Sequence, residues 1–163
     1  MPSKRVIPTA ELPKMLAEIE TRLAGWIEYY DSDLHGIGHL REVALLAGQI
    51  AAEADIDVEA AMVAGFLHDC ARVDDGGGNW HALSSAQLAR PLLEQYFPRL
   101  DAEKICCAIA AHADGTTSTD PLVGALWDAD RLTLTRLMRP VSLSLLSTDA
   151  GRRLAGERGA TVE

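Results

Sequence analysis

Histidine and aspartate side chains recur along this chain in a pattern that can hold a divalent metal. His68 and Asp69 are adjacent in the run AMVAGFLHDCAR, near the end of an apolar stretch. The other candidate donors are His39, His81, His112 and Asp130. A buried charge pair is costly unless an opposite charge compensates it, and a metal ion supplies that charge. Imidazole and carboxylate donors favour Zn, Mn, Fe, Ni or Co over Ca. The absence of cysteine from the set argues against a structural zinc site.

Composition limits the classes of protein to consider. The chain has 163 residues, of which 48% are hydrophobic, and this predicts a single domain over residues 1–163 with a sizeable core. The net charge of −9 argues against a nucleic-acid partner and against an anionic membrane surface. The sequence contains no apolar run long enough to span a membrane and no evident N-terminal signal, so we expect a cytoplasmic protein.

Three cysteines, Cys70, Cys106 and Cys107, give no disulfide framework, because their number is odd and two of them are neighbours. We expect all three to be small apolar core residues in a reducing compartment.

Apolar residues recur at three- and four-residue steps, which indicates helices throughout. Asp57, Asp101 and Asp120 are suited to cap three of these helices. The expected ranges are 12–30, 38–54, 58–71, 81–96, 102–112 and 121–139, with one or two short helices in 142–157. The fold class is therefore all-α, a single-domain bundle of about six to seven helices.

The order of four motifs resembles the HD superfamily of metal-dependent phosphohydrolases, in particular its small stand-alone bacterial members. The motifs are HGIGHLREV, HDCARVDDG, a later histidine at the end of a helix, and DADRL. The resemblance covers roughly residues 31–137, which would form the core of the domain. It implies that His39, His68, Asp69 and Asp130 are metal ligands. Asp128, two residues before Asp130, would point elsewhere as a solvated or supporting carboxylate.

His81 and His112 decide how many ions the site holds. Both lie in segments that resemble those supplying two further histidines in dinuclear members, which implies one or two ions per chain. The alternatives are a surface position for His81 and a phosphate or core contact for His112. His35, four residues before His39, would hold a neighbouring loop or ligand in place, or have no chemical role.

The resemblance implies hydrolysis of a phosphate ester or anhydride, with a nucleotide-like molecule as the small phosphorylated substrate. Asp69 would accept the proton of the attacking water, and Arg72 would clamp phosphate oxygens. Arg131 and Lys104 are weaker candidates, because Arg131 would pair with a carboxylate such as Asp128 and Lys104 would be solvated. A homodimer is expected only because small enzymes often form one.

Two other functions are consistent with the same residues. A mixed-valent diiron oxygenase of the inositol-oxygenase-like type could use all six donors, and a regulatory module could bind metal and nucleotide without turnover. The run HADGTT departs from the signature of cyclic dinucleotide phosphodiesterases, so that activity is not expected. The polar loops 72–80 and 114–120 are the expected rims of the substrate pocket. Trp80, beside the first of them, is expected to be a packing residue.

Overall fold

The computed structural model describes residues 7–159, which contain seven α-helices and no β-strand. The α-helices are α1 (Leu12–Leu23), α2 (Ile37–Glu53), α3 (Val58–Leu67), α4 (Trp80–Tyr96), α5 (Ala102–Ala110), α6 (Pro121–Leu132) and α7 (Asp149–Glu157). Three short 3-10 helices accompany them: η1 (Thr9–Glu11), η2 (Thr133–Leu137) and η3 (Leu143–Leu145). The predicted all-α class is confirmed. None of the helices within residues 7–159 has the length and apolar character needed to cross a membrane.

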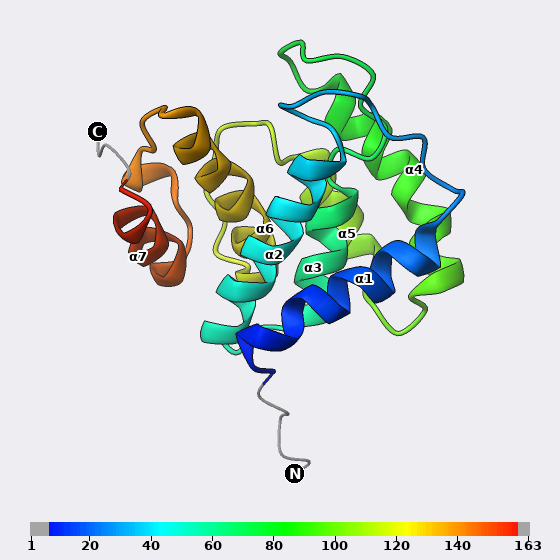
Figure 1. Cartoon of the computed structure of the whole chain (residues 1–163), viewed down its shortest axis with the longest axis horizontal. Helices are drawn as coiled ribbons and strands as arrows, with labels where there is room; N and C mark the ends of the chain where they lie inside the picture. Colours follow the sequence, from blue (N-terminus) through cyan, green and yellow to red (C-terminus); the bar gives the residue numbers. More distant parts are fainter. Residues whose placement is uncertain (1–6, 160–163) are drawn as a thin grey trace.

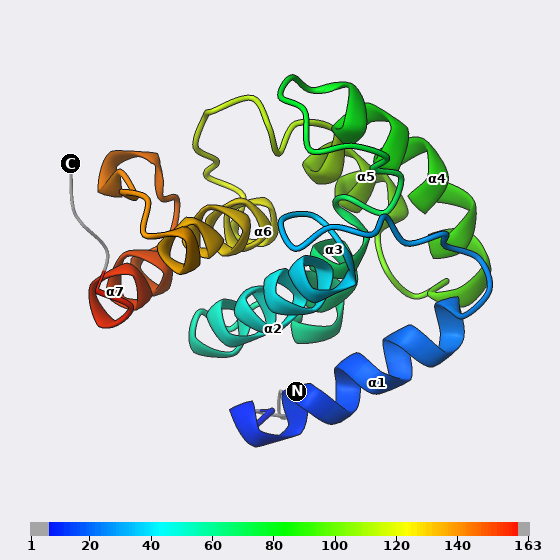
Figure 2. The same ribbon diagram turned by 45° about the horizontal axis from the view of Figure 1, so that its top comes forward.

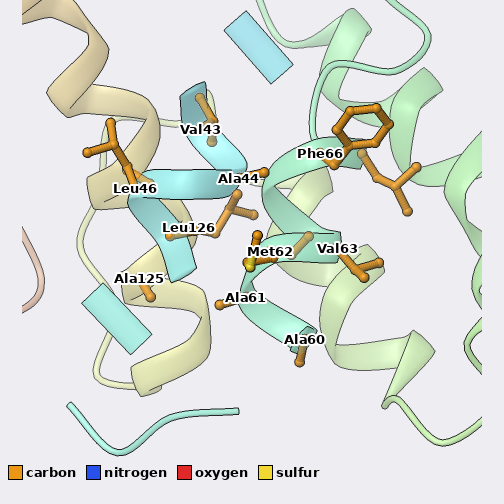
Figure 3. Packing of buried hydrophobic residues seen from close by; sticks show 14 of the residues in the cluster. Val43, Ala44, Leu46, Ala60, Ala61, Met62, Val63, Phe66, Ala125 and Leu126 are labelled. Atoms are coloured by element: carbon orange, nitrogen blue, oxygen red, sulfur yellow. The ribbon is translucent and has the colours of Figure 1, made fainter. Parts of the chain in front are cut away.

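Helix α3 lies at the centre of the bundle (Figures 1 and 2). Of its ten residues, only Glu59 is not buried, so α3 must be surrounded on all sides. It packs most extensively against α2, and α6 lies against α2 and α3, with α7 outside α6. Helix α4 pairs with α5 on the other side, while α1 runs along α2. Figure 3 shows the side chains that fill the space between α2, α3 and α6.

Helices α2 and α3 approach closely because small residues face each other where they cross. A Cβ atom added to Gly65 of α3 would lie 2.9 Å from the Ala44 Cα atom of α2 and 3.0 Å from the Val43 carbonyl oxygen. Only a residue without a side chain fits there. The close crossing brings the first turn of α2 near the end of α3, where the histidine and aspartate candidates lie.

The predicted N-terminal caps are confirmed. The side chains of Asp57, Asp101 and Asp120 accept hydrogen bonds from backbone N–H groups in the first turns of α3, α5 and α6. Each carboxylate satisfies donors that a helix start otherwise leaves without partners.

Three predicted helix ends are wrong. Helix α3 ends at Leu67, and not near Ala71. Helix α1 ends at Leu23, and not near Tyr30, because Gly25 adopts a positive φ of 82° that a helix cannot contain. Helix α6 ends at Leu132, and residues 133–137 form the tighter η2 instead of continuing to Pro140. In place of the predicted α-helix, the chain after α1 is a loop and the chain after α6 is the 3-10 helix η2.

One cysteine prediction is also wrong. Cys70 and Cys106 are buried, and burial raises the pKa of Cys70 to about 12. Cys107, expected in the core, is exposed, because it lies on the outward face of α5.

Candidate metal centre

All six predicted donors meet at one end of the bundle. They come from five places in the chain: His39 in the first turn of α2, His68 and Asp69 directly after α3, His81 at the start of α4, His112 after α5, and Asp130 in α6. The prediction that His68 and Asp69 lie within the third helix is wrong, because α3 ends at Leu67 and His68 is its C-cap. Asp130 is partly open, with a side chain about 26% exposed, and the other five are buried.

His39, His68 and Asp130 form one cluster. The Nε2 atoms of His39 and His68 are 3.1 Å apart, and Asp130 Oδ1 lies 3.3 Å from the first and 3.4 Å from the second. Atoms that bind one ion at about 2.1 Å lie roughly 3.0–3.4 Å from each other. These three residues therefore have the spacing of ligands around a single divalent ion.

Asp69 faces two groups of histidines. Its Oδ2 atom lies 3.7 Å from His39 Nε2 and 3.5 Å from His68 Nε2. Its Oδ1 atom lies 3.5 Å from His81 Nε2 and 3.4 Å from His112 Nε2. One carboxylate can thus contribute an oxygen to each of two neighbouring ions.

Backbone carbonyls fix two of the imidazole rings. His68 Nδ1 lies 2.7 Å from the Gly65 carbonyl oxygen, and His112 Nδ1 lies 2.7 Å from that of Ile109. Each Nδ1–H donates to the carbonyl three residues earlier, at the end of α3 or α5. This arrangement leaves the Nε2 lone pair of the neutral ring free for a metal.

Buried atoms without partners provide the test of fit. Within residues 7–159, Asp69 Oδ1, His39 Nδ1 and His81 Nδ1 are buried and make no hydrogen bond. A buried carboxylate oxygen without a donor is costly. A cation held by His68, Asp69 and His112, whose donor atoms all lie within 4.8 Å of one another, would compensate the buried charge of Asp69, so the donor set fits a bound divalent metal.

Charge interactions inside the cluster are strong. Burial opposes a charge on His68, but the Asp69 and Asp130 carboxylates outweigh it and raise its pKa to about 9. Burial also opposes ionisation of Asp69 and Asp130, yet the neighbouring histidines hold the pKa of both carboxyl groups well below the usual value. Burial lowers the pKa of His81 to about 4, which keeps this ring neutral. The carboxylates are therefore charged and ready to bind a cation.

Arg72 holds the loop that follows the His68–Asp69 pair. It is buried, and its Nε and Nη2 atoms donate to the carbonyl oxygens of Asp74 and Gly76, at 2.9 and 2.8 Å. Its Nη1 atom lies 3.8 Å from Asp69 Oδ1. Two of its three nitrogens are thus used within the protein, which leaves Nη1 for any phosphate contact.

His35 joins two loops beside the cluster. Its Nδ1 atom lies 2.7 Å from Asp75 Oδ1, and the Ser32 hydroxyl donates to the same carboxylate at 2.8 Å. The segment 24–36 is therefore attached to the segment 72–79, and both lie at the top of Figure 1. This contact agrees with the expectation that His35 stabilises a loop.

Asp128 is buried and structural, whereas the sequence predicted a solvated or supporting carboxylate. It accepts hydrogen bonds from Ser147 N, Thr148 N and the Thr148 hydroxyl, at 2.7–2.8 Å. Arg131 donates to the Leu145 and Thr116 carbonyls instead of pairing with Asp128. Lys104 is half-exposed as expected, but it pairs with Asp120 at 3.0 Å.

A cleft of about 270 Å³ opens beside the cluster and is lined by His39 and Asp130. Asp75 of the predicted rim 72–80 lines it, whereas no residue of 114–120 does. Its other wall is formed by residues of the segment 131–139, which the sequence pattern predicted to be part of a helix over 121–139. Trp80, expected to pack, is 40% exposed and does not line this cleft. A larger cavity of about 590 Å³ lies behind Arg72 and contains none of the six donors.

Comparison with known proteins decides the family. The HD domain family matches residues 36–135, which is more than half of the chain and includes all six donors. The chain belongs to the HD domain family. A crystal structure of a predicted HD superfamily hydrolase from an uncultured Thermotogales bacterium is similar, with a TM-score of 0.63 and 26% identity. The match covers 91% of this chain and 85% of that one.

Curated relatives of this HD domain are longer proteins. Ribonuclease Y of Chlorobium luteolum is 31% identical over 136 residues, which are 82% of this chain and 24% of the relative. Ribonuclease Y of Lawsonia intracellularis is 37% identical over 93 residues, which are 56% of this chain and 16% of the relative. The chain thus spans at most about a quarter of the curated relatives it matches. Family and structural neighbour together support metal-dependent hydrolysis as the general class of activity.

Proposed function

We propose that this HD domain is a phosphohydrolase that uses a pair of divalent ions. The observation that carries the proposal is the placement of Asp69, whose two oxygens face His39 and His68 on one side and His81 and His112 on the other. A single-ion site would have no use for the second pair of histidines around an otherwise unpartnered oxygen.

Bound divalent ions would supply positive charge for phosphate oxygens and lower the pKa of a bound water. The protein contributes the positions of the donors. His68 and His112 are fixed by backbone carbonyls, so their Nε2 lone pairs need no reorientation when a cation arrives. Burial of five donors keeps bulk water away from the charged groups, which strengthens each electrostatic interaction.

The geometry favours Asp130 over Asp69 as the group that accepts a proton. Asp69 is 4% exposed and both of its oxygens face histidines, so it is better placed as a ligand. Asp130 lines the cleft, and its Oδ1 faces His39 and His68. We therefore assign its Oδ2 as the atom that takes the proton of the attacking water. Arg72 would donate a hydrogen bond to a phosphate oxygen through its Nη1 atom, which lies near Asp69.

The proposed substrate is a phosphate ester or anhydride, nucleotide-like as the family resemblance implies, and the cleft of about 270 Å³ beside His39 and Asp130 is the place where its phosphate would bind. Because the relatives named ribonuclease Y match only through part of their length, phosphodiesters of RNA are one class to test among several.

The first experiment combines metal analysis with a substrate panel. Protein purified without added metal, and protein reconstituted with Mn²⁺, should contain close to two ions per chain and hydrolyse at least one member of a panel of phosphomonoesters, phosphodiesters and phosphoanhydrides. His112→Ala should lower the content to about one ion and reduce kcat at least about 100-fold. Arg152→Ala is the control, because Arg152 pairs with Asp149 on α7 and does not line the cleft.

The outcomes separate the alternatives. Two irons per chain with oxygen uptake and no hydrolysis would replace the proposal by an oxygenase. Tight nucleotide binding without turnover would indicate a regulatory module, and no metal after reconstitution would refute the metal centre itself.

A further inference from the structure

Three arginines line one wall of the cleft, and the sequence analysis did not predict that this segment would border the substrate. Arg131, Arg136 and Arg139 come from the end of α6 and from η2 and the turn after it, and they share the cleft with His39 and Asp130. A substrate that enters the cleft lies against this wall. Their existing contacts decide which of them can bind a substrate.

Arg131 and Arg136 are used within the protein. The Arg131 guanidinium donates to two carbonyls, as described above. The Arg136 guanidinium donates to Glu42 at 2.9 Å and to the Asp33 carbonyl at 3.2 Å. The Arg139 side chain is exposed and makes no hydrogen bond or ion pair with any other residue of 7–159. It is the cation of this wall whose five N–H donors remain available.

The position of Arg139 is fixed although its side chain is free. Met138 adopts a left-handed conformation with a φ of 54°, and the backbone N–H of Arg139 donates to the Leu134 carbonyl at 3.0 Å. Pro140 follows and restricts the backbone of Arg139 to an extended form. The turn is joined to α2 through the pair Arg136–Glu42, and Glu42 lies three residues after His39, on the same face of that helix. The backbone that carries the guanidinium is therefore held beside the cleft, while the side chain itself can move to meet a ligand.

The rest of the cleft indicates the size and chemistry of the ligand. Leu34, Leu134 and Leu137 line it together with the polar side chains of His35, Asp75 and Thr133, and no Phe, Tyr or Trp of the described residues does. A volume of about 270 Å³ suits a small molecule more than a polymer. A free guanidinium binds phosphate or carboxylate through paired hydrogen bonds.

We propose that Arg139 binds a second anionic group of a small substrate, a phosphate or a carboxylate distinct from the phosphate that meets the metal-binding side chains. The inference rests on the proposed phosphohydrolase function and narrows its substrate class to small molecules with two anionic groups. Arg139 is then a determinant of specificity and takes no part in bond cleavage.

The test uses two ligands that cannot be hydrolysed, so that it does not depend on turnover. Propylphosphonate has one anionic group, and propane-1,3-bisphosphonate has the same carbon chain with a second one. Calorimetric titration of Mn²⁺-loaded protein should show that the wild type binds the bisphosphonate about tenfold more tightly. Arg139→Ala should reduce this preference to less than about twofold and leave the affinity for propylphosphonate unchanged. Arg139→Lys should retain part of it, because the charge remains but the paired geometry is lost.

Arg152→Ala is the matched control, since Arg152 is a half-exposed arginine on α7 that pairs with Asp149 and does not line the cleft. Metal content after each titration excludes removal of the ion by the bisphosphonate. The inference is overturned if the wild type shows no preference, or if Arg139→Ala keeps it, whatever the hydrolysis panel gives. Conversely, a preference that depends on Arg139 together with no hydrolysis would refute the proposed activity and leave the binding site standing.

Discussion

At the scale of single residues, His68 connects the metal centre to pH. Without metal its pKa of about 9 lies above the ordinary value of 6.5. A group with a raised folded-state pKa stabilises the fold below pH 6.5, and this stabilisation is lost as the pH rises to about 9. A metal requires the neutral ring. Below about pH 9 the ion must therefore displace a proton from His68.

We expect the apparent affinity for Mn²⁺ to rise by up to about tenfold per pH unit below about pH 9, with release of about one proton per chain at pH 7. Calorimetry in two buffers of different ionisation enthalpy measures that proton directly. His81, with a pKa near 4, is already neutral and should release none. A proton count near zero at pH 7 would show that His68 is neutral in the metal-free protein.

At the scale of elements, the crossing of α2 and α3 sets the distance between His39 and His68. Gly65→Ala would place a Cβ atom within 3.0 Å of the α2 backbone. Backbone cannot move aside as a side chain can, so we expect the free energy of unfolding to fall by about 1–3 kcal/mol and metal affinity to weaken.

Gly156→Ala on α7 is the matched control, because its Cβ atom meets nothing within 4 Å. It should leave metal affinity unchanged and stability equal or about 0.5–1 kcal/mol higher. Urea unfolding and metal titration of both variants make the comparison.

The sequence predicts the starts of these helices better than their ends. A cap depends on local chemistry, so Asp57, Asp101 and Asp120 could be identified from their neighbours alone. The end of α1 could not, because Ile27 continues the apolar spacing and is buried, yet it lies in non-helical chain after Gly25. Apolar spacing records which side chains enter the core and does not record the backbone that carries them there.

At the scale of the whole molecule, the donors could be predicted but the cleft could not. The order and types of His39, His68, Asp69 and Asp130 are properties of the sequence. The structure brings these four side chains together, and their binding of a metal stays a prediction. The cleft wall that carries Arg139 depends on the contact of η2 with α2 through the pair Arg136–Glu42. These residues are far apart in the sequence, and no local pattern encodes their contact. The only sequence signal of this wall was three arginines within nine residues after Asp130.

The metal centre should also stabilise the entire fold. Its donors come from α2, α3, α4, α5 and α6 or from the turns directly after them, so the bound ions together join helices that otherwise meet through apolar contacts. An ion that binds only the folded state, at about 1,000 times its dissociation constant, stabilises by about 4 kcal/mol. For a chain of this length that corresponds to a rise in Tm of roughly 8–16 °C.

Differential scanning calorimetry with Mn²⁺ and then with excess EDTA measures the shift. EDTA already saturated with Ca²⁺ is the control for effects of the chelator itself. Equal Tm values with Mn²⁺ and with EDTA would mean that the six side chains do not bind an ion together, and the predicted two-ion site would fail with them.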